Sequence, residues 1–540
     1  MIRRRDFLQS TVLLSTLSAA TLTTPASMAA TPESTGARGP ARAFDFAALK
    51  GRARALANAA YSAPAKLAPN ALINLDYDQY QSLRFRRDQA IWGKEERGFR
   101  LEFFHLGRGF KEPVEMYEIV DGAAREIRYQ PSLFEFRKTG IDPRALPPDL
   151  GFAGFRIHAA TNWDADVASF LGASYFRGVG SDTRQFGLSA RALAIDTANG
   201  VEEFPRFVAW WFERPVNDSR TLVFYGLLDS PSIAGAYRFA LTPGAPQIVE
   251  VDSAIYPRKS IRRLGIAALT SMYQMGENDR RLANDWRPEI HDSDGLALWS
   301  GNGEWIWRPL TNPAFPRVNS FFDESPRGFG LLQRDRNFVN YQDDGVFYER
   351  RPSLWIEPKT GWGKGAVQLV ELTTADETFD NIVAYWNPTE PPKPGDELLY
   401  SYRMFWGTQM PANPPLAQVV ATRTGIGGVV GQKRKYFSWR FAVDFVGGEL
   451  GALAERADVE PVISVSRGGV EITSARPLAS LKGYRAMFDV KPTDDSVEPI
   501  DIRLFLRHER QPLTETWIYQ WTPPSPKERK AALQLAGSSD

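Results

Sequence analysis

A chain of 540 residues is too long for one ordinary domain, so two or three domains around a large core are expected. Its 65 basic and 64 acidic side chains nearly cancel, so bulk charge gives no sign of a nucleic-acid-binding surface. The lack of cysteine excludes disulfides, thiolate metal sites and cysteine nucleophiles.

The first 29 residues have the pattern of an export signal. Arginines at positions 3–5 precede an uncharged stretch that ends in a small-residue cleavage site at 27–29. The run RRDFL at 4–8 also fits the twin-arginine form, which exports proteins that are already folded. The uncharged stretch is too weakly apolar to favour a membrane anchor. We therefore expect a periplasmic protein without stable membrane insertion, with a flexible leader over residues 30–43.

Two helices are predicted near the start of the mature chain. Apolar residues recur at helical spacing within 44–60, and a second helix is expected near LPPDLGF at 146–152. Most other segments favour strands, because they are short, β-branched or aromatic, and bounded by turn residues. The clearest are 207–213, 221–228, 366–372 and 381–386. Regularly spaced crossover helices are missing, so the fold class is predicted as mainly β, with an antiparallel sandwich.

A proline-rich segment, NPTEPPKPGD, separates two strand-rich regions and is interpreted as a domain linker over 387–395. It would divide a large β-sandwich at 44–386 from a second domain at 396–525. The second region has about the strand number of an immunoglobulin-like sandwich, beginning with ELLYSYRMFW at 397–406. Residues 526–540 are expected to be a frayed polar tail. The glycine-rich stretch 423–437 is either a mobile solvent loop or a lid over the cleft of the first domain.

Several chemistries find no support in the sequence. The four histidines, at 105, 158, 291 and 508, are far apart and form no zinc-binding pair. Read as a calcium loop, 292–294 would require carboxylates where Ile290 and Gly301 stand. Nucleophile elbows, phosphate-binding loops and dinucleotide fingerprints are also missing. We therefore expect neither a metal nor a cofactor.

Carboxylates among aromatic residues are what remain. RPEIHDSDGL at 287–296 is followed by several tryptophans and then by ETFDNIVAYW at 377–386. Sugars bind through apolar faces on aromatic rings and through polar groups that contact hydroxyls, and glycoside hydrolysis uses a pair of carboxyl groups. The pattern alone leaves other readings open, since Asp292 and Asp294 suit a turn, Asp380 a strand start, and alternating tryptophans a core.

Several longer runs are similar to a known family. GFAGFRIH (151–158), FLGASYFRGVG (170–180), RPEIHDSDGL (287–296), PRGFGLLQRDR (326–336), YERRPSLWIEP (348–358) and DNIVAYW (380–386) resemble the periplasmic glucan biosynthesis proteins G and D of Gram-negative bacteria. The matches follow one another in order over most of residues 45–525. The twin-arginine signal favours the D branch, because the G branch is generally exported by the ordinary secretory route.

This resemblance implies a galactose mutarotase-like sandwich joined to an immunoglobulin-like domain. It further implies action on the β-1,2-linked backbone of osmoregulated periplasmic glucans by an anomer-inverting hydrolase or transglycosylase. The motifs would make Asp380 the general acid, Asp292 the general base and Tyr348 part of the proton path. Expected substrate contacts are Glu377, Asp294, His291, Trp355, Trp362 and Trp386; Asp294 is alternatively a residue that orients Asp292 or closes its turn.

The expected partners are linear β-1,2-glucan chains and, transiently, the inner-membrane glucan synthesis machinery. A rival hypothesis is a non-catalytic scaffold that presents the glucan backbone to modifying enzymes. A third, sugar mutarotation, rests only on analogy of fold and would require a histidine acid, for which His291 is the one candidate in the suspected site.

Overall fold

The computed structural model describes residues 39–535 except 66, 96, 184, 430 and 454–457. The predicted signal peptide and most of the leader lie outside the described residues. Within the described ranges, every helix is too short or too polar to cross a membrane.

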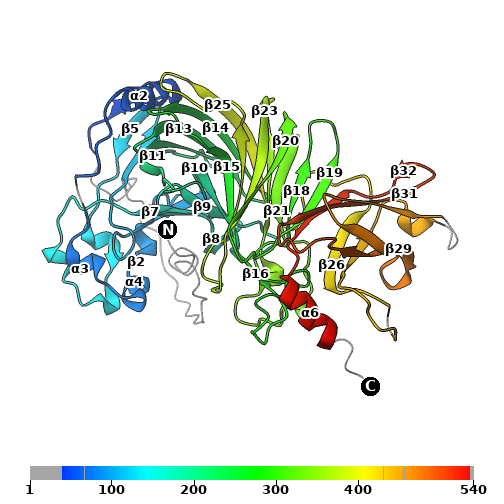
Figure 1. Ribbon diagram of the computed structural model, residues 1–540. Helices are drawn as coiled ribbons and strands as arrows, with labels where there is room; N and C mark the ends of the chain where they lie inside the picture. Colours follow the sequence, from blue (N-terminus) through cyan, green and yellow to red (C-terminus); the bar gives the residue numbers. More distant parts are fainter. Residues whose placement is uncertain are drawn as a thin grey trace.

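Two large, curved β-sheets face one another and form most of the molecule (Figure 1). The larger sheet contains β1 (Arg42–Ala43), β4 (Glu115–Val120), β5 (Ala123–Glu126), β11 (Arg206–Glu213), β12 (Leu222–Asp229), β13 (Ile233–Thr242), β14 (Gln247–Pro257), β18 (Gly295–Trp299), β19 (Trp305–Pro309), β21 (Gly328–Leu332), β22 (Ser353–Pro358) and β25 (Leu398–Gly407). The nine-stranded sheet contains β3 (Phe99–Phe104), β7 (Gly154–Ala159), β8 (Asn162–Leu171), β9 (Tyr175–Gly178), β10 (Ser189–Ile195), β15 (Leu264–Ser271), β20 (Arg317–Glu324), β23 (Lys364–Glu371) and β24 (Ile382–Pro388).

Aromatic side chains fill the space between these sheets. Phe155 and Phe170 stack on each other with ring centroids 4.8 Å apart, and both meet Trp210 of the opposite sheet edge-on. Burying such rings supplies much of the hydrophobic stabilisation. The mainly β sandwich expected from the strand pattern is therefore confirmed.

One of the two predicted helices is present. Helix α2 (Phe46–Asn58) is capped by Asp45, whose carboxylate accepts from the Ala48 amide at 2.7 Å, and it covers β13. The prediction of a helix near 146–152 is wrong, and the nearest helical turn is the 3-10 turn Pro143–Ala145. The successive prolines 147 and 148 lack amide donors and restrict the residues before them, which disfavours a helix here. The shorter elements are α3 (Asn70–Ile73), α4 (Tyr77–Ser82), α5 (Phe338–Tyr341), and the paired strands β2 (Arg84–Phe85) and β6 (Phe134–Glu135).

The proline-rich segment does not lead into a new domain. β25 follows it directly and pairs over most of its length with β14 on one side and with β22 on the other. The prediction that residues 397–406 open the second sandwich is therefore wrong. A strand's residues indicate that it is extended, but its partners are set by the whole sheet. The chain leaves the large sandwich only after Gly407.

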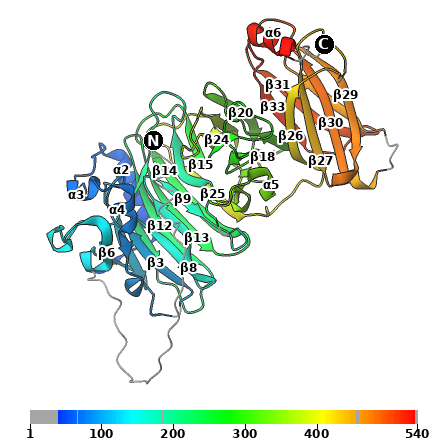
Figure 2. The ribbon, with the colours of Figure 1, turned by 90° about the horizontal axis from the view of Figure 1, so that it is seen from below.

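A smaller C-terminal sandwich follows, beside the large one in Figure 2. Its four-stranded sheet consists of β26 (Gln418–Ile426), β27 (Trp439–Val446), β29 (Gly469–Leu478) and β30 (Gly483–Lys491). Its other strands are β28 (Glu460–Val465), β31 (Ile500–His508), β32 (Gln511–Pro512) and β33 (Thr516–Trp521). β33 pairs in parallel with β19, so these strands continue the large sheet to a total of sixteen strands.

One segment of the C-terminal sandwich differs from expectation, and a second, the candidate lid, can be placed in the fold. Residues 526–535 are no frayed tail but helix α6 (Pro526–Leu535), because buried Arg529 donates to the carbonyls of Pro524, Asp494 and Ser496. The candidate lid at 423–437 begins inside β26, and the Gly428 amide beyond the strand donates to Asp489 of the same sandwich at 2.6 Å.

Candidate functional site

The turn HDSDG lies between β17 (Ile290–His291) and β18. β17 pairs with β16 (Tyr273–Met275), which follows β15 after one residue. The Asp292 amide donates to the Met272 carbonyl at 2.8 Å, and the hydroxyls of Ser293 and Ser271 are 2.9 Å apart. The end of β15 therefore fixes the position of Asp292.

The start of β24 is fixed by the same segment. The Asn381 side chain accepts from the Tyr273 amide at 2.8 Å and donates to the Tyr273 carbonyl at 2.9 Å. Ser271 also pairs with Ile382 in the sheet. Alternate residues of a strand turn their backbone groups to opposite sides. Met272 faces Asp292, and Tyr273 faces Asn381, the residue after Asp380. Asp292 and Asp380 therefore flank the short segment 271–273.

Asp380 is half-buried and lies near the half-buried Tyr175 and the buried Arg191. Burial raises the pKa of the Tyr175 phenol to about 12, Arg191 opposes this increase, and the charge of Asp380 adds to it. Arg191 is itself held by Thr270 at 2.8 Å and by Glu202 at 2.6 Å, and its guanidinium lies over the Tyr175 ring at 5.1 Å. Asp380 therefore has fixed neighbours on one side and solvent access on another.

Asp292 is fully buried, and its carboxylate accepts a hydrogen bond from Arg351. The Arg351 guanidinium also lies 4.2 Å from the ring centroid of Tyr348, which is 1% exposed. The Tyr348 hydroxyl donates to Glu377 at 2.6 Å, and the Glu377 side chain is 37% exposed. A continuous series of contacts thus runs from the buried base candidate to a carboxylate at the surface.

The residue before Tyr348 has an unusual backbone conformation. Phe347 has φ +50° and ψ +62°, in the left-handed region that bulky L-residues rarely occupy. Strain of this kind tends to be retained at functional sites, where it fixes the position of a neighbouring side chain. Here it precedes the 3-10 turn Tyr348–Arg350, which presents the phenol to Glu377.

Glu377 is anchored by Arg287, the first residue of the run RPEIHDSDGL. One guanidinium nitrogen of Arg287 donates to Glu377 at 2.9 Å and to Asp343 at 2.8 Å, and the other terminal nitrogen donates to Asp285 at 3.0 Å. Three carboxylates therefore share one cation, which restricts Glu377 to a single orientation.

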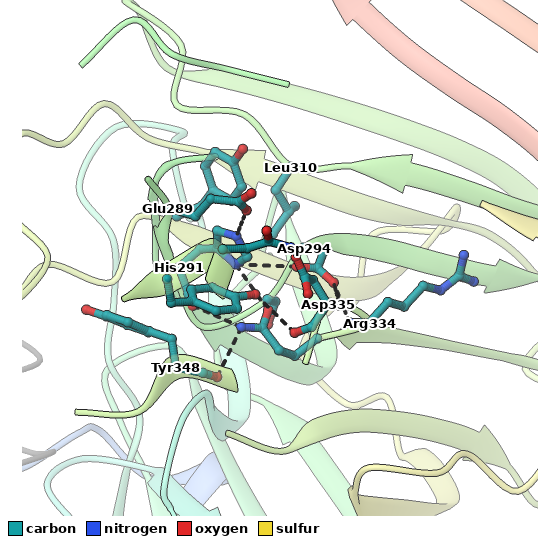
Figure 3. Close-up of polar contacts among 12 residues, drawn as sticks. Glu289, His291, Asp294, Leu310, Arg334, Asp335 and Tyr348 are labelled. Atoms are coloured by element: carbon teal, nitrogen blue, oxygen red, sulfur yellow. Dashed lines mark hydrogen bonds and ion pairs between the residues drawn. The ribbon is translucent and has the colours of Figure 1, made fainter. Parts of the chain in front are cut away.

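His291 is the centre of a second, buried cluster, shown in Figure 3. Its Nε2 lies 2.8 Å from Glu289, and its Nδ1 lies 3.1 Å from Gln333 and 3.5 Å from Asp294. Burial lowers the pKa of His291, but the hydrogen bond to Glu289 and the charges of Asp294 and Glu289 outweigh burial and raise it to about 9. Both ring nitrogens are engaged, so His291 holds the turn and has no nitrogen left for a sugar hydroxyl.

Asp294 closes the turn through the backbone. Its carboxylate accepts from the amides of Arg334 and Asp335, and its own amide donates to the Leu332 carbonyl at 2.8 Å. Burial raises the pKa of Asp294 to about 6, while the nearby His291 cation opposes the increase. These contacts support the turn-closing role of Asp294 over a direct sugar contact. In Figure 3 the Arg334 side chain points away from His291.

A pocket lies between this cluster and the C-terminal sandwich. It encloses about 420 Å³, part of it open to solvent, and is lined on one side by Glu289, His291 and Asp294 and on the other by residues 419–422 of β26. Glu277 lies in the wall, where burial raises its pKa to about 8 even though Arg423 is 3.0 Å away. Both sandwiches therefore build the surroundings of the turn.

The three tryptophans expected to bind substrate belong to the core. Trp386, Trp355 and Trp362 are 0%, 1% and 7% exposed. Trp386 and Trp362 contact each other with centroids 6.1 Å apart, and Trp355 stacks on Trp305 at 5.7 Å. Their faces are covered by other side chains, so the expectation that they bind sugar is corrected: alternating tryptophans in these strands fill the interior.

Sequence reasoning missed the residues that connect the site. Arg351, Arg287 and Gln333 all lie inside the runs that carried the family resemblance, but nothing in their spacing indicates their partners. Gln333 donates to the carbonyls of both His291 and Tyr348 at 3.2 Å, which joins the two clusters. Within the described ranges, the acidic and histidine side chains form no group of three or more that would hold a metal ion.

Taken together, the fold and site define a large two-sandwich β-protein with carboxylates arranged around a buried turn at the junction of its sandwiches. The sequence matches the periplasmic glucan biosynthesis protein family MdoG over residues 44–521. It is 59% identical to glucans biosynthesis protein D of Xanthomonas axonopodis pv. citri, over 98% of this chain and 100% of that protein. It is 61% identical to the protein of that name from Xanthomonas campestris pv. campestris, over 91% and 93% of the two chains. The Stenotrophomonas maltophilia protein is 59% identical over 97% and 98%.

The chain therefore belongs to the periplasmic glucan biosynthesis protein family, as the motifs in its sequence had indicated.

Proposed function

We propose that this protein is an anomer-inverting enzyme that hydrolyses or transfers chains of β-1,2-glucan. Asp380 is the general acid, Asp292 the general base, and Tyr348 lies on the proton path between solvent and Asp292. The observation that carries this proposal is the placement of Asp380 and Asp292 on either side of the segment 271–273. An inverting pair needs two carboxyl groups on opposite faces of the reacting sugar, with room between them for a nucleophile.

The reaction is a single displacement. The Asp380 carboxyl gives its proton to the glycosidic oxygen as the bond from that oxygen to the anomeric carbon breaks. A water oxygen, or a sugar hydroxyl in the case of transfer, attacks the anomeric carbon from the opposite face and forms the new bond. The proton that this nucleophile loses passes to the Asp292 carboxylate. A β-linkage is therefore converted into a product with the α configuration.

The burial of Asp292 supports a relayed proton transfer. Its carboxylate is fully buried and paired with Arg351, so a nucleophile in the open part of the site needs intermediate groups to reach it. Tyr348, between Arg351 and the partly exposed Glu377, is one such hydroxyl. The Arg351 cation favours the ionised form of its partner, which is the form that a base requires.

The decisive experiment incubates the purified protein with linear β-1,2-glucan and measures both product length and, by NMR during the first turnovers, product anomer. We expect chain shortening or transfer with an α anomer formed first. Asp380→Asn should lower kcat by roughly 100- to 10,000-fold, because it removes the transferable proton while preserving shape. The matched control is Asp164→Asn, an exposed aspartate of β8 whose side chain is 78% exposed.

Two results would contradict the proposal in different ways. A product with the β configuration would require a double displacement and another pair of carboxylates. Binding of the glucan with no turnover by the wild-type protein would instead support a scaffold that presents the backbone to other enzymes.

We also propose that the protein reaches the periplasm through the twin-arginine route, on the basis of Arg4 and Arg5. Replacing both with lysine should leave the protein in the cytoplasm. Normal export of this variant would show that the ordinary secretory route is used.

A further inference from the structure

One tryptophan is exposed, whereas the others are buried or half-buried. All fifteen tryptophans lie within the described residues. Eleven are buried, Trp163, Trp299 and Trp439 are half-buried, and Trp286 is 72% exposed. Burying a large aromatic ring stabilises a protein, so folding does not explain the position of Trp286. A lone exposed apolar side chain is common, however, and the surroundings of this one have to decide its role.

Those surroundings lead directly to the proposed proton path. The Trp286 ring centroid lies 6.0 Å from the Arg287 guanidinium, which donates to Glu377 at 2.9 Å. Glu377 in turn accepts from the Tyr348 hydroxyl at 2.6 Å. The indole is thus three contacts from Tyr348, on the side of the site that is open to solvent.

The segment that carries Trp286 is rigidly held. Asp285 accepts from the Arg287 amide at 2.9 Å and from the guanidinium at 3.0 Å, so the residues on both sides of Trp286 are bonded to each other. Asp343 binds the same guanidinium at 2.8 Å from another loop. The exposed ring therefore projects from a fixed base and loses little conformational freedom when a ligand covers it.

We propose that Trp286 is a sugar-stacking platform that binds one glucose unit of the glucan chain beside the reacting bond. This rests on the proposed function and names a substrate contact for it. A pyranose has an apolar face of C–H groups and a rim of hydroxyls. The indole face suits the apolar C–H face of the sugar, and the partly exposed Glu377 carboxylate can accept hydrogen bonds from the sugar hydroxyls. A protein-binding hot spot would instead sit in an apolar, desolvated surround, whereas Asp285, Arg287 and Glu377 are charged.

Fluorescence gives a test that does not depend on turnover. Because Trp286 is the only exposed indole, iodide should quench the wild-type emission and quench Trp286→Phe much less. A linear β-1,2-glucan of defined length should protect the wild-type emission from iodide. The same measurement on Asp380→Asn, which should bind glucan without turning it over, separates binding from catalysis. Protection of Trp286 from iodide can therefore be interpreted even if the catalytic proposal fails.

Affinity and kinetics complete the test. Trp286→Ala should weaken glucan binding at least about tenfold, and Trp286→Tyr should restore part of that loss because it keeps a flat ring. KM should rise more than kcat falls. The matched control is Trp163→Phe, a half-buried tryptophan that also has an arginine, Arg100, over its ring at 4.1 Å, and this variant should bind glucan normally.

Three outcomes would overturn the inference. The first is that glucan gives the wild-type emission no protection from iodide. The second is that Trp286→Ala binds glucan with wild-type affinity. Unchanged glucan binding together with a changed sedimentation coefficient in Trp286→Ala would assign the residue to a contact between protein molecules.

Discussion

Arg334 and Glu515 form a two-point ion pair between the two sandwiches, with nitrogen–oxygen distances of 2.5 and 3.1 Å. The Glu515 carboxylate is fully buried and also accepts from the Val419 amide at 2.8 Å. The backbone amide of Arg334 donates to Asp294 in the HDSDG turn. The C-terminal sandwich therefore holds the loop against which the turn closes.

Breaking this pair from one side should be costly. Glu515→Ala leaves a largely buried guanidinium without its carboxylate, and we expect about 3–5 kcal/mol less stability in urea unfolding. Replacing both residues with apolar side chains of similar volume should restore most of the loss. The control is Glu304→Ala, which breaks the more exposed inter-sandwich pair with Arg503 and should cost about 0–1 kcal/mol. Equal losses in the two single variants would contradict this ranking.

Arg351 should control the pH dependence of activity through Asp292. Arg351→Met removes the cation that favours an ionised partner, so the acidic limb of the kcat/KM profile should move to higher pH. Arg351→Lys keeps the charge and should recover part of the activity, although it loses the planar stacking on Tyr348. A uniform loss at every pH, with the shape of the profile unchanged, would mean that Arg351 acts only on folding or binding.

Loss of the proton from buried His291 should make the protein less stable at alkaline pH. The pKa of His291 is about 9 in the folded protein and about 6.5 in an unfolded chain. The folded state therefore binds the proton more tightly, and this stabilisation is complete below about pH 6.5 and lost as pH rises through 9. His291→Gln should be less stable than the wild type at pH 6.5. Between pH 6.5 and 9.5 its stability should fall by on the order of 2 kcal/mol less than that of the wild type. Parallel urea-unfolding stability profiles for the two proteins would refute the assignment.

Glu277 provides an independent check at the inter-sandwich pocket. Burial raises its pKa from 4.5 to about 8, so the folded state favours the neutral carboxyl and stability falls as pH rises from about 4.5 through 8. Glu277→Gln fixes a neutral side chain and should flatten that part of the profile. If the wild type keeps constant stability over this range, Glu277 is ionised in the pocket.

Trp386 should behave as a core residue. Trp386→Ala leaves a large cavity under β23 and should cost about 3–5 kcal/mol. The smaller change Trp386→Phe should reduce stability without changing KM for β-1,2-glucan. If Trp386→Phe raises KM without changing stability, Trp386 contacts the substrate.

Local sequence patterns predict local structure well in this chain. The apolar residues at helical spacing within 44–60 indicate helix α2, and the aromatic and β-branched runs indicate most of the strands. The same patterns do not distinguish a tryptophan in the core from one on a binding surface. Trp355 and Trp386 lie on strands that are covered on both faces, which depends on sheet order and not on neighbouring residues.

The candidate site shows the same division. The motifs identified Asp292 and Asp380, but Arg351 is 59 residues from Asp292, and Glu515 is 181 residues from Arg334. Such pairings arise only when distant strands assemble, so no spacing in the sequence predicts them. Trp286 directly precedes the motif 287–296, and its exposure alone sets it apart from the other tryptophans near the turn.

The position of β25 has a consequence for how the chain folds. This strand is the link between β14 and β22 in the order of the large sheet, yet it ends at Gly407, late in the sequence. A polypeptide that stops before residue 398 would have two unpaired strand edges in the middle of its largest sheet, and such edges recruit other chains. The sandwich can close only after about three quarters of the chain has been made, through contacts between residues far apart in sequence, which form slowly. The unfinished chain therefore keeps both edges open until β25 has been synthesised, and it is the form most exposed to aggregation.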